Sequence, residues 1–148
     1  MRLVITAVSF LGFSSFGCAL ASVTSDAAVG HWYSEDHYPH GRIFVIEYLE
    51  ADGSFRTEFR ECFSMGGSRD HTESGHWTLS SDRLSMVTEA IADKPVHLSG
   101  EYATISMNAS TWDLHTVGGD ALRVFGPATF RKVRVTADSK LPGCELTS

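Results

Sequence analysis

Basic residues are scarce in this chain of 148 residues, which has 12 lysines and arginines against 18 aspartates and glutamates and a net charge of −6. Contacts to phosphate groups need lysine and arginine, and the few present form no cluster, which argues against nucleic-acid binding. The same balance argues against attachment to an anionic membrane surface. Low-complexity segments and proline- or glycine-rich linkers are also missing, so we expect a single domain.

Sequence motifs of known catalytic chemistry are missing as well. The chain has no Gly-x-Ser-x-Gly elbow, no HExxH motif, no phosphate-binding loop and no Cys–His signature. Its glycine-rich segment, 64–68, lacks the lysine and the following helix that a phosphate-binding loop would need. We therefore expect a protein that is not an enzyme, and the sequence implies no cofactor.

Long apolar runs are limited to one, at the start of the chain. Arg2 precedes an apolar stretch over 3–16, and Ala19-Leu20-Ala21 follows it. This order is typical of a signal peptide, here 1–21, cleaved after Ala21 to leave a mature domain of residues 22–148. The stretch is shorter than the roughly 20 residues of a membrane-spanning helix. We expect a periplasmic or secreted protein without a membrane span; a lipoprotein acylated on Cys18 is the alternative.

Cysteines number only three, and Cys18 lies in the predicted signal peptide. The other two, Cys62 and Cys144, would reach an oxidising compartment after export, where paired cysteines commonly form disulfides. We expect a Cys62–Cys144 disulfide, with two free thiols as the alternative.

What the sequence does contain is apolar residues with a period of two, which predicts β-strands. In 55–63, for example, the phenylalanines all share one face, and Cys62 lies on the other. A bulge is expected near Gly100. The predicted strands are 31–34, 42–49, 55–63, 75–79, 84–90, 96–107, 112–116, 121–125 and 129–135. Short strands with short connections predict an all-β, antiparallel up-and-down meander that closes into a barrel of eight to nine strands, or a sandwich.

Five short motifs occur in an order that resembles the short bacterial lipocalin-like (calycin) domains over most of 29–135. They are Gly30-His31-Trp32, Pro39-His40-Gly41-Arg42, Asp52-Gly53-Ser54-Phe55, Gly75-His76-Trp77 and Phe130-Arg131-Lys132-Val133. The resemblance implies that Trp32 closes one end of the barrel, with Arg131 packed across its ring. It also implies that a disulfide ties the C-terminal tail to the barrel wall, which Cys62 and Cys144 would form. The helix that usually precedes the last lipocalin strand is not predicted here.

Candidate ligand-binding residues are the aromatic and apolar side chains expected inside the barrel. They are Phe44, Ile46, Tyr48, Phe55, Phe59, Phe63, Trp77 and Tyr102. They would line a pocket for an apolar ligand, or they would simply fill the core. A third possibility is a metal site at His31, His37 and His40, near two carboxylates; a solvated loop is the alternative interpretation of that segment.

Two classes of function follow from these patterns. The first is an exported carrier that holds a small apolar molecule in the barrel. The second is a filled barrel that acts on a protein partner through its loops, as inhibitors do, with 22–29 as an inserting arm. A cavity above roughly 300 Å³ would favour the carrier. We expect a monomer in either case.

Overall fold

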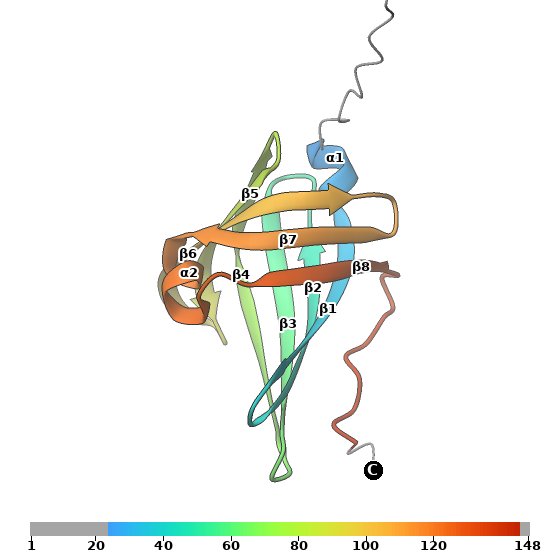
Figure 1. Ribbon diagram of the computed structural model, residues 1–148, viewed down its shortest axis with the longest axis vertical. Helices are drawn as coiled ribbons and strands as arrows, with labels where there is room; N and C mark the ends of the chain where they lie inside the picture. Colours follow the sequence, from blue (N-terminus) through green and yellow to red (C-terminus); the bar gives the residue numbers. More distant parts are fainter. Residues whose placement is uncertain (1–23, 146–148) are drawn as a thin grey trace, which may run out of the picture.

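The computed structural model describes residues 24–145, and they form a closed antiparallel barrel (Figure 1). The strands follow one another around the barrel in chain order, and β1 pairs with β8 to close it. The all-β meander predicted from the sequence is confirmed. The elements are α1 (Ser25–Ala28), β1 (Gly30–Tyr38), β2 (Gly41–Leu49), β3 (Ser54–Phe63), β4 (Ser68–Ser80), β5 (Arg83–Ile91), β6 (Lys94–Met107), β7 (Thr111–Gly118), α2 (Gly119–Phe125) and β8 (Thr129–Val135).

The predicted signal peptide, 1–21, and the alternative lipid site at Cys18 lie outside the described residues. Within 24–145, neither of the helices is long and apolar enough to cross a membrane.

The predicted strand 121–125 is wrong, because this segment lies in helix α2. Gly119, with a φ of +72°, turns the chain out of β7. The carboxylate of Asp120 then accepts a hydrogen bond of 2.9 Å from the backbone N–H of Ser99, which holds the helix against β6. Strands β7 and β8 pair directly with each other, so the ladder has no place for another strand. The barrel therefore has eight strands, and a short helix precedes the last one.

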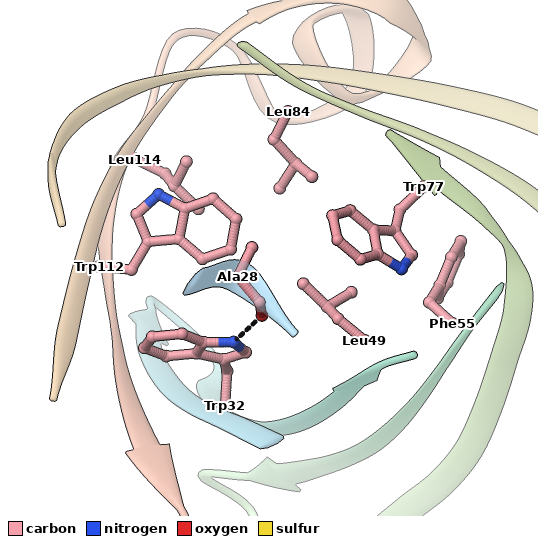
Figure 2. Close-up of a cluster of buried hydrophobic side chains, with 8 residues drawn as sticks. All are labelled: Ala28, Trp32, Leu49, Phe55, Trp77, Leu84, Trp112 and Leu114. Carbon is pink, nitrogen blue, oxygen red and sulfur yellow. Dashed lines mark hydrogen bonds between the residues drawn. The ribbon is translucent and has the colours of Figure 1, made fainter. Parts of the chain in front are cut away.

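The half of the barrel near α1 is filled by a cluster of buried apolar side chains (Figure 2). Trp32 is 0% exposed, and its indole N–H donates a hydrogen bond of 2.7 Å to the carbonyl oxygen of Ala28 in α1. Its ring meets that of Trp112 edge-on, with centroids 5.5 Å apart. The cluster consists of Ala28, Trp32, Leu49, Phe55, Trp77, Leu84, Trp112 and Leu114. Helix α1 thus closes one end of the barrel by packing on its apolar interior.

The arginine that covers Trp32 is Arg134, and the predicted contact with Arg131 is wrong. The guanidinium carbon of Arg134 lies 4.2 Å from the centre of the Trp32 ring. Arg131 instead forms two hydrogen bonds with Asp113 on the outside of the barrel. Successive side chains of a strand point to opposite faces of the sheet, so Arg131 and Arg134, three positions apart in β8, lie on opposite faces. Gly30 leaves room for the guanidinium, since a Cβ there would lie 2.4 Å from Nη1 of Arg134.

The predicted disulfide between Cys62 and Cys144 is confirmed, with the two Cα atoms 5.3 Å apart. It ties the C-terminal tail to the outer face of β3. Arg60 and Arg42 hold the tail on either side, by hydrogen bonds to the carbonyl oxygens of Pro142 (3.1 Å) and Glu145 (3.2 Å). Figure 1 shows the tail leaving β8 and running toward the end of the barrel that carries the β3–β4 hairpin.

Candidate functional site

The other half of the barrel holds a cavity of about 310 Å³. Its floor is the apolar cluster, with which it shares Phe55, and its rim is formed by β6 and α2. Polar and apolar side chains from most of the strands line it. They are Ser34, Val45, Glu47, Phe55, Thr57, Phe59, Glu73, Met86, Thr88, Leu98, Ser99, Tyr102, Asp120, Ala121, Val124, Phe130 and Lys132, with Gly100 of β6. The barrel is therefore filled at one end and hollow at the other.

Three of the predicted ligand-binding residues, Phe55, Phe59 and Tyr102, line this cavity. Trp77 lies deeper, in the apolar cluster, where its indole N–H donates to the carbonyl oxygen of Glu50. Phe63, at the end of β3, is 36% exposed and does not reach the cavity. The aromatic side chains predicted to line the cavity therefore do so at Phe55 and Phe59 of β3 and at Tyr102 of β6, but not at Phe63, the last residue of β3.

Phe44, Ile46 and Tyr48 do not line the cavity, because they lie on the outer face of β2. The β2–β3 register pairs Leu49 with Phe55, and both point inward. Side chains of β2 that share the inward face with Leu49 are therefore Val45 and Glu47, which line the cavity. Phe44 and Ile46 are nevertheless buried, at 3% and 1% exposure. Strand β2 has buried apolar residues on both faces, so its composition did not indicate which face points into the barrel.

A buried ion pair lies at the boundary between the cavity and the core. The ammonium of Lys132 in β8 donates to the carboxylate of Glu47 in β2, and the two residues are 5% and 6% exposed. The Lys132 nitrogen also lies 5.5 Å from the ring centre of Trp112 and 5.8 Å from that of Phe130. The ammonium of Lys132 therefore already has a carboxylate counter-ion and two aromatic neighbours within the protein. Sequence reasoning missed both residues, because β2 has apolar residues on both faces and the sequence did not show that Glu47 and Leu49 point inward.

Glu73 of β4 is a second carboxylate in the cavity, and its polar contacts are long. The hydroxyl of Thr88 lies 3.4 Å from one carboxylate oxygen, and Nε2 of His71 lies 3.8 Å from the other. Burial raises the pKa of Glu73; nearby His71 and the hydrogen bond from Thr88 oppose this rise, and the Glu47 carboxylate adds a smaller rise. The protein therefore holds Glu73 in a place that disfavours its charge. No motif in the sequence indicated this residue.

Tyr102 of β6 faces both of these carboxylates. Burial raises its pKa to about 12, and the charges of Glu47 and Glu73 add to the effect. The phenol is consequently neutral at physiological pH and offers a hydroxyl to the cavity. Together these groups give the interior an excess of negative charge.

We expect Glu73 to lower the stability of the unliganded protein, and a Glu73→Gln variant tests this expectation. An acid whose pKa is raised on folding destabilises the folded state at a pH where it is ionised in the unfolded chain. We expect Glu73→Gln to unfold at a higher temperature than the wild type at neutral pH. The gain should shrink as the pH falls through the raised pKa of Glu73 toward the range where it is neutral in both states. Thermal unfolding at several pH values measures this; a lower melting temperature at neutral pH would contradict it.

The rim of the cavity is apolar on the side of α2. Val124 of α2 and Leu98 of β6 are 67% and 39% exposed, and both line the opening. Across the barrel, the ring of Phe59 stacks on that of His71, with centroids 4.6 Å apart and nearly parallel planes. Phe59 lines the cavity, whereas His71 lies outside its lining.

A second hollow, of about 580 Å³, runs along 70–72 of β4 and is bounded by the tail at Lys140 and Leu141. It lies on the outside of the barrel beside the tail, and two of its charges are paired with each other, since the Arg60 guanidinium forms two hydrogen bonds with the Asp70 carboxylate, of 2.9 and 2.7 Å. Arg60 also donates to carbonyl oxygens of the tail. We therefore assign the candidate site to the barrel cavity.

The histidines predicted as metal ligands are not brought together. His31 packs edge-on against Tyr48, His37 pairs with Glu35 at 2.9 Å, and His40 lies in the β1–β2 turn. Among residues 24–145, no group of three or more histidine, cysteine, aspartate or glutamate side chains is placed to hold a metal ion.

Comparison with known proteins gives no indication of function, so the inference of function rests on the cavity. A scan against protein-family models found no match, and searches of curated proteins and of solved structures found no significant similarity.

Proposed function

We propose that this protein is an exported, non-enzymatic carrier that binds a small molecule in the hollow half of a lipocalin-like barrel. The observation that carries the proposal is the cavity of about 310 Å³, which lies within the range of small-molecule sites, roughly 300–1,000 Å³. A barrel of eight strands is small enough for its own side chains to fill, so a half-empty interior needs an explanation.

Several features support a barrel of the lipocalin type. Trp32 at the closed end is covered by an arginine of the last strand, Arg134, and a short helix precedes that strand. The Cys62–Cys144 disulfide ties the tail to the wall, as the resemblance implied, and such a bond is consistent with export to an oxidising compartment.

The lining changes the ligand that we expect. Glu47, Glu73, Lys132 and Tyr102 are polar groups inside the cavity, among apolar side chains such as Phe59. A purely apolar ligand would desolvate the carboxylate of Glu73 further and leave it only its long contacts to Thr88 and His71, which is costly. We therefore propose an amphipathic molecule, with its polar group deep in the cavity and its apolar part toward the rim.

The alternative, an interaction module with a filled barrel, rests on one observation. Met65, at the tip of the β3–β4 hairpin, is 99% exposed and would suit contact with a protein partner. The hollow half of the barrel has no role in that function, so we place the carrier first.

Two valine variants with the same substitution test the carrier. Val45 lines the cavity, whereas Val87 of β5 lies between two cavity residues, Met86 and Thr88, and so faces the other way. We expect Val45→Phe to weaken binding of the neutral fluorescent probe N-phenylnaphthylamine by about tenfold or more, since the larger ring occupies the cavity. Val87→Phe should bind it as the wild type does.

Fluorescence titration of the folded mature proteins measures this difference, with circular dichroism to confirm that both variants keep the barrel. Equal affinity in the two variants would place the probe outside the barrel and contradict the carrier.

A further inference from the structure

We infer that the ligand of the cavity is a cation: a compact ammonium group on an apolar, aromatic or aliphatic body, with the ammonium at the carboxylate of Glu73. This inference rests on the proposed carrier function and adds the chemical class of the ligand.

The first step is the balance of charge in the cavity. Lys132 is the cation that faces it, and its ammonium is already bound to Glu47. Asp120 at the rim is held by the N–H of Ser99 and by Arg123. Glu73 remains, with contacts of 3.4 and 3.8 Å that leave its carboxylate short of strong partners. A cationic ligand would supply the missing charge.

The second step concerns an anionic ligand, which the ion pair disfavours. An anion would have to displace the Glu47 carboxylate from Lys132, whose ammonium is further fixed by the rings of Trp112 and Phe130. It would then lie among the carboxylates of Glu47 and Glu73 in a desolvated site, where like charges repel strongly.

The third step is the aromatic lining around Glu73. Phe59, Phe130 and Tyr102 all line the cavity, and cations bind favourably to the faces of such rings. Phe59 already stacks on His71 and Phe130 lies near the Lys132 ammonium, so Tyr102, which is close enough to Glu73 for their charges to interact, is the ring that matters most. The neutral Tyr102 hydroxyl supplies an acceptor for an ammonium N–H. Leu98 and Val124 at the rim provide the apolar surface for the body of the ligand.

The same geometry predicts that acid releases the ligand. Binding of a cation favours ionised Glu73, so affinity should fall as the pH drops through the pKa of Glu73, which burial has raised. The titratable groups that act on Glu73 are His71 of its own strand, Glu47 of β2 and Tyr102 of β6, and Lys132 of β8 is paired with Glu47.

The test compares three ligands with one body and different heads: phenylpropylammonium, phenylpropanol and phenylpropanoate. We expect the mature protein to bind the ammonium most tightly, by roughly tenfold or more over the alcohol, in calorimetric titration at neutral pH. Glu73→Gln, which keeps the shape and removes the charge, should abolish this preference. Glu89→Gln, which removes an exposed carboxylate paired with His76 outside the cavity, should keep it.

The outcomes separate the ligand class from the carrier function. Equal binding of the three compounds, tightest binding of the carboxylate, or an unchanged preference in Glu73→Gln would overturn the cationic ligand and leave the carrier standing. Binding of N-phenylnaphthylamine inside the barrel with no binding of the ammonium would do the same. A wild type that binds neither the probe nor any of the three compounds would overturn both.

Discussion

Replacing Trp32 by alanine will lower the free energy of unfolding by about 3–5 kcal/mol, as expected for a fully buried tryptophan. The side chain is 0% exposed and packs against Trp112 and Ala28. The truncation also removes the ring beneath Arg134 and the hydrogen bond that holds helix α1 over the end of the barrel. Urea denaturation followed by the fluorescence of the remaining tryptophans measures the loss.

The arginines of β8 provide a matched pair of controls for this result. Arg134→Ala should destabilise the fold by about 2 kcal/mol, since it removes a cation–π contact and hydrogen bonds to the carbonyl oxygens of Ala27 and Val29. Arg131→Ala, which affects an exposed pair with Asp113, should leave the stability essentially unchanged. A larger effect for Arg131 than for Arg134 would contradict the assignment of Arg134 to Trp32.

Removing only one charge of the buried pair will have an effect of similar size. We expect Lys132→Met to cost about 3–5 kcal/mol, because it leaves the buried Glu47 carboxylate without its counter-ion. The measurement is again the free energy of unfolding in urea, with the protein unliganded.

The double variant Glu47→Leu/Lys132→Met separates the cost of an unpaired charge from the worth of the pair. Two apolar residues in place of a buried ion pair are often tolerated, so the double variant should recover most of the stability lost in the single one. If the double variant were as unstable as Lys132→Met, the pair would contribute to folding in its own right, contrary to this expectation.

The two halves of the barrel differ in the side chains that they hold. The closed half is apolar and packed, with Trp32, Trp77 and Trp112 in contact with aliphatic neighbours. The open half keeps Glu73 in surroundings that disfavour its charge. Residues that cost stability in the unliganded protein are commonly those that a binding site needs.

The sequence by itself determined the class of fold. The β-branched and aromatic residues of 42–49, the alternation over 55–63 and the short turn 50–53 between them predict neighbouring antiparallel strands, because side chains of a strand alternate between two faces and short loops join adjacent strands. It also determined the disulfide partners, since only Cys62 and Cys144 follow the predicted signal peptide.

Only the tertiary structure decided which face of each strand is internal. Strand β2 has apolar residues on both faces. In the barrel Glu47 points inward and Ile46 outward, and nothing in the local sequence of β2 shows this orientation. The composition of 121–125 predicts a strand. Because β7 pairs directly with β8, no edge is left for this segment to pair with, and it forms part of α2 instead. Pairing is a property of segments distant in sequence, so local composition could not supply it.

The candidate site was hidden for the same physical reason. Glu47, Glu73 and Lys132 belong to three different strands, and each looks like an ordinary surface charge in its own segment. The burial of Glu47 and Lys132, their pairing and the long contacts of the half-buried Glu73 arise only when the barrel closes. The sequence established an antiparallel meander, in a barrel or a sandwich; the pairing of β1 with β8 closed it into a barrel and brought these charged residues of distant segments together in the hollow half.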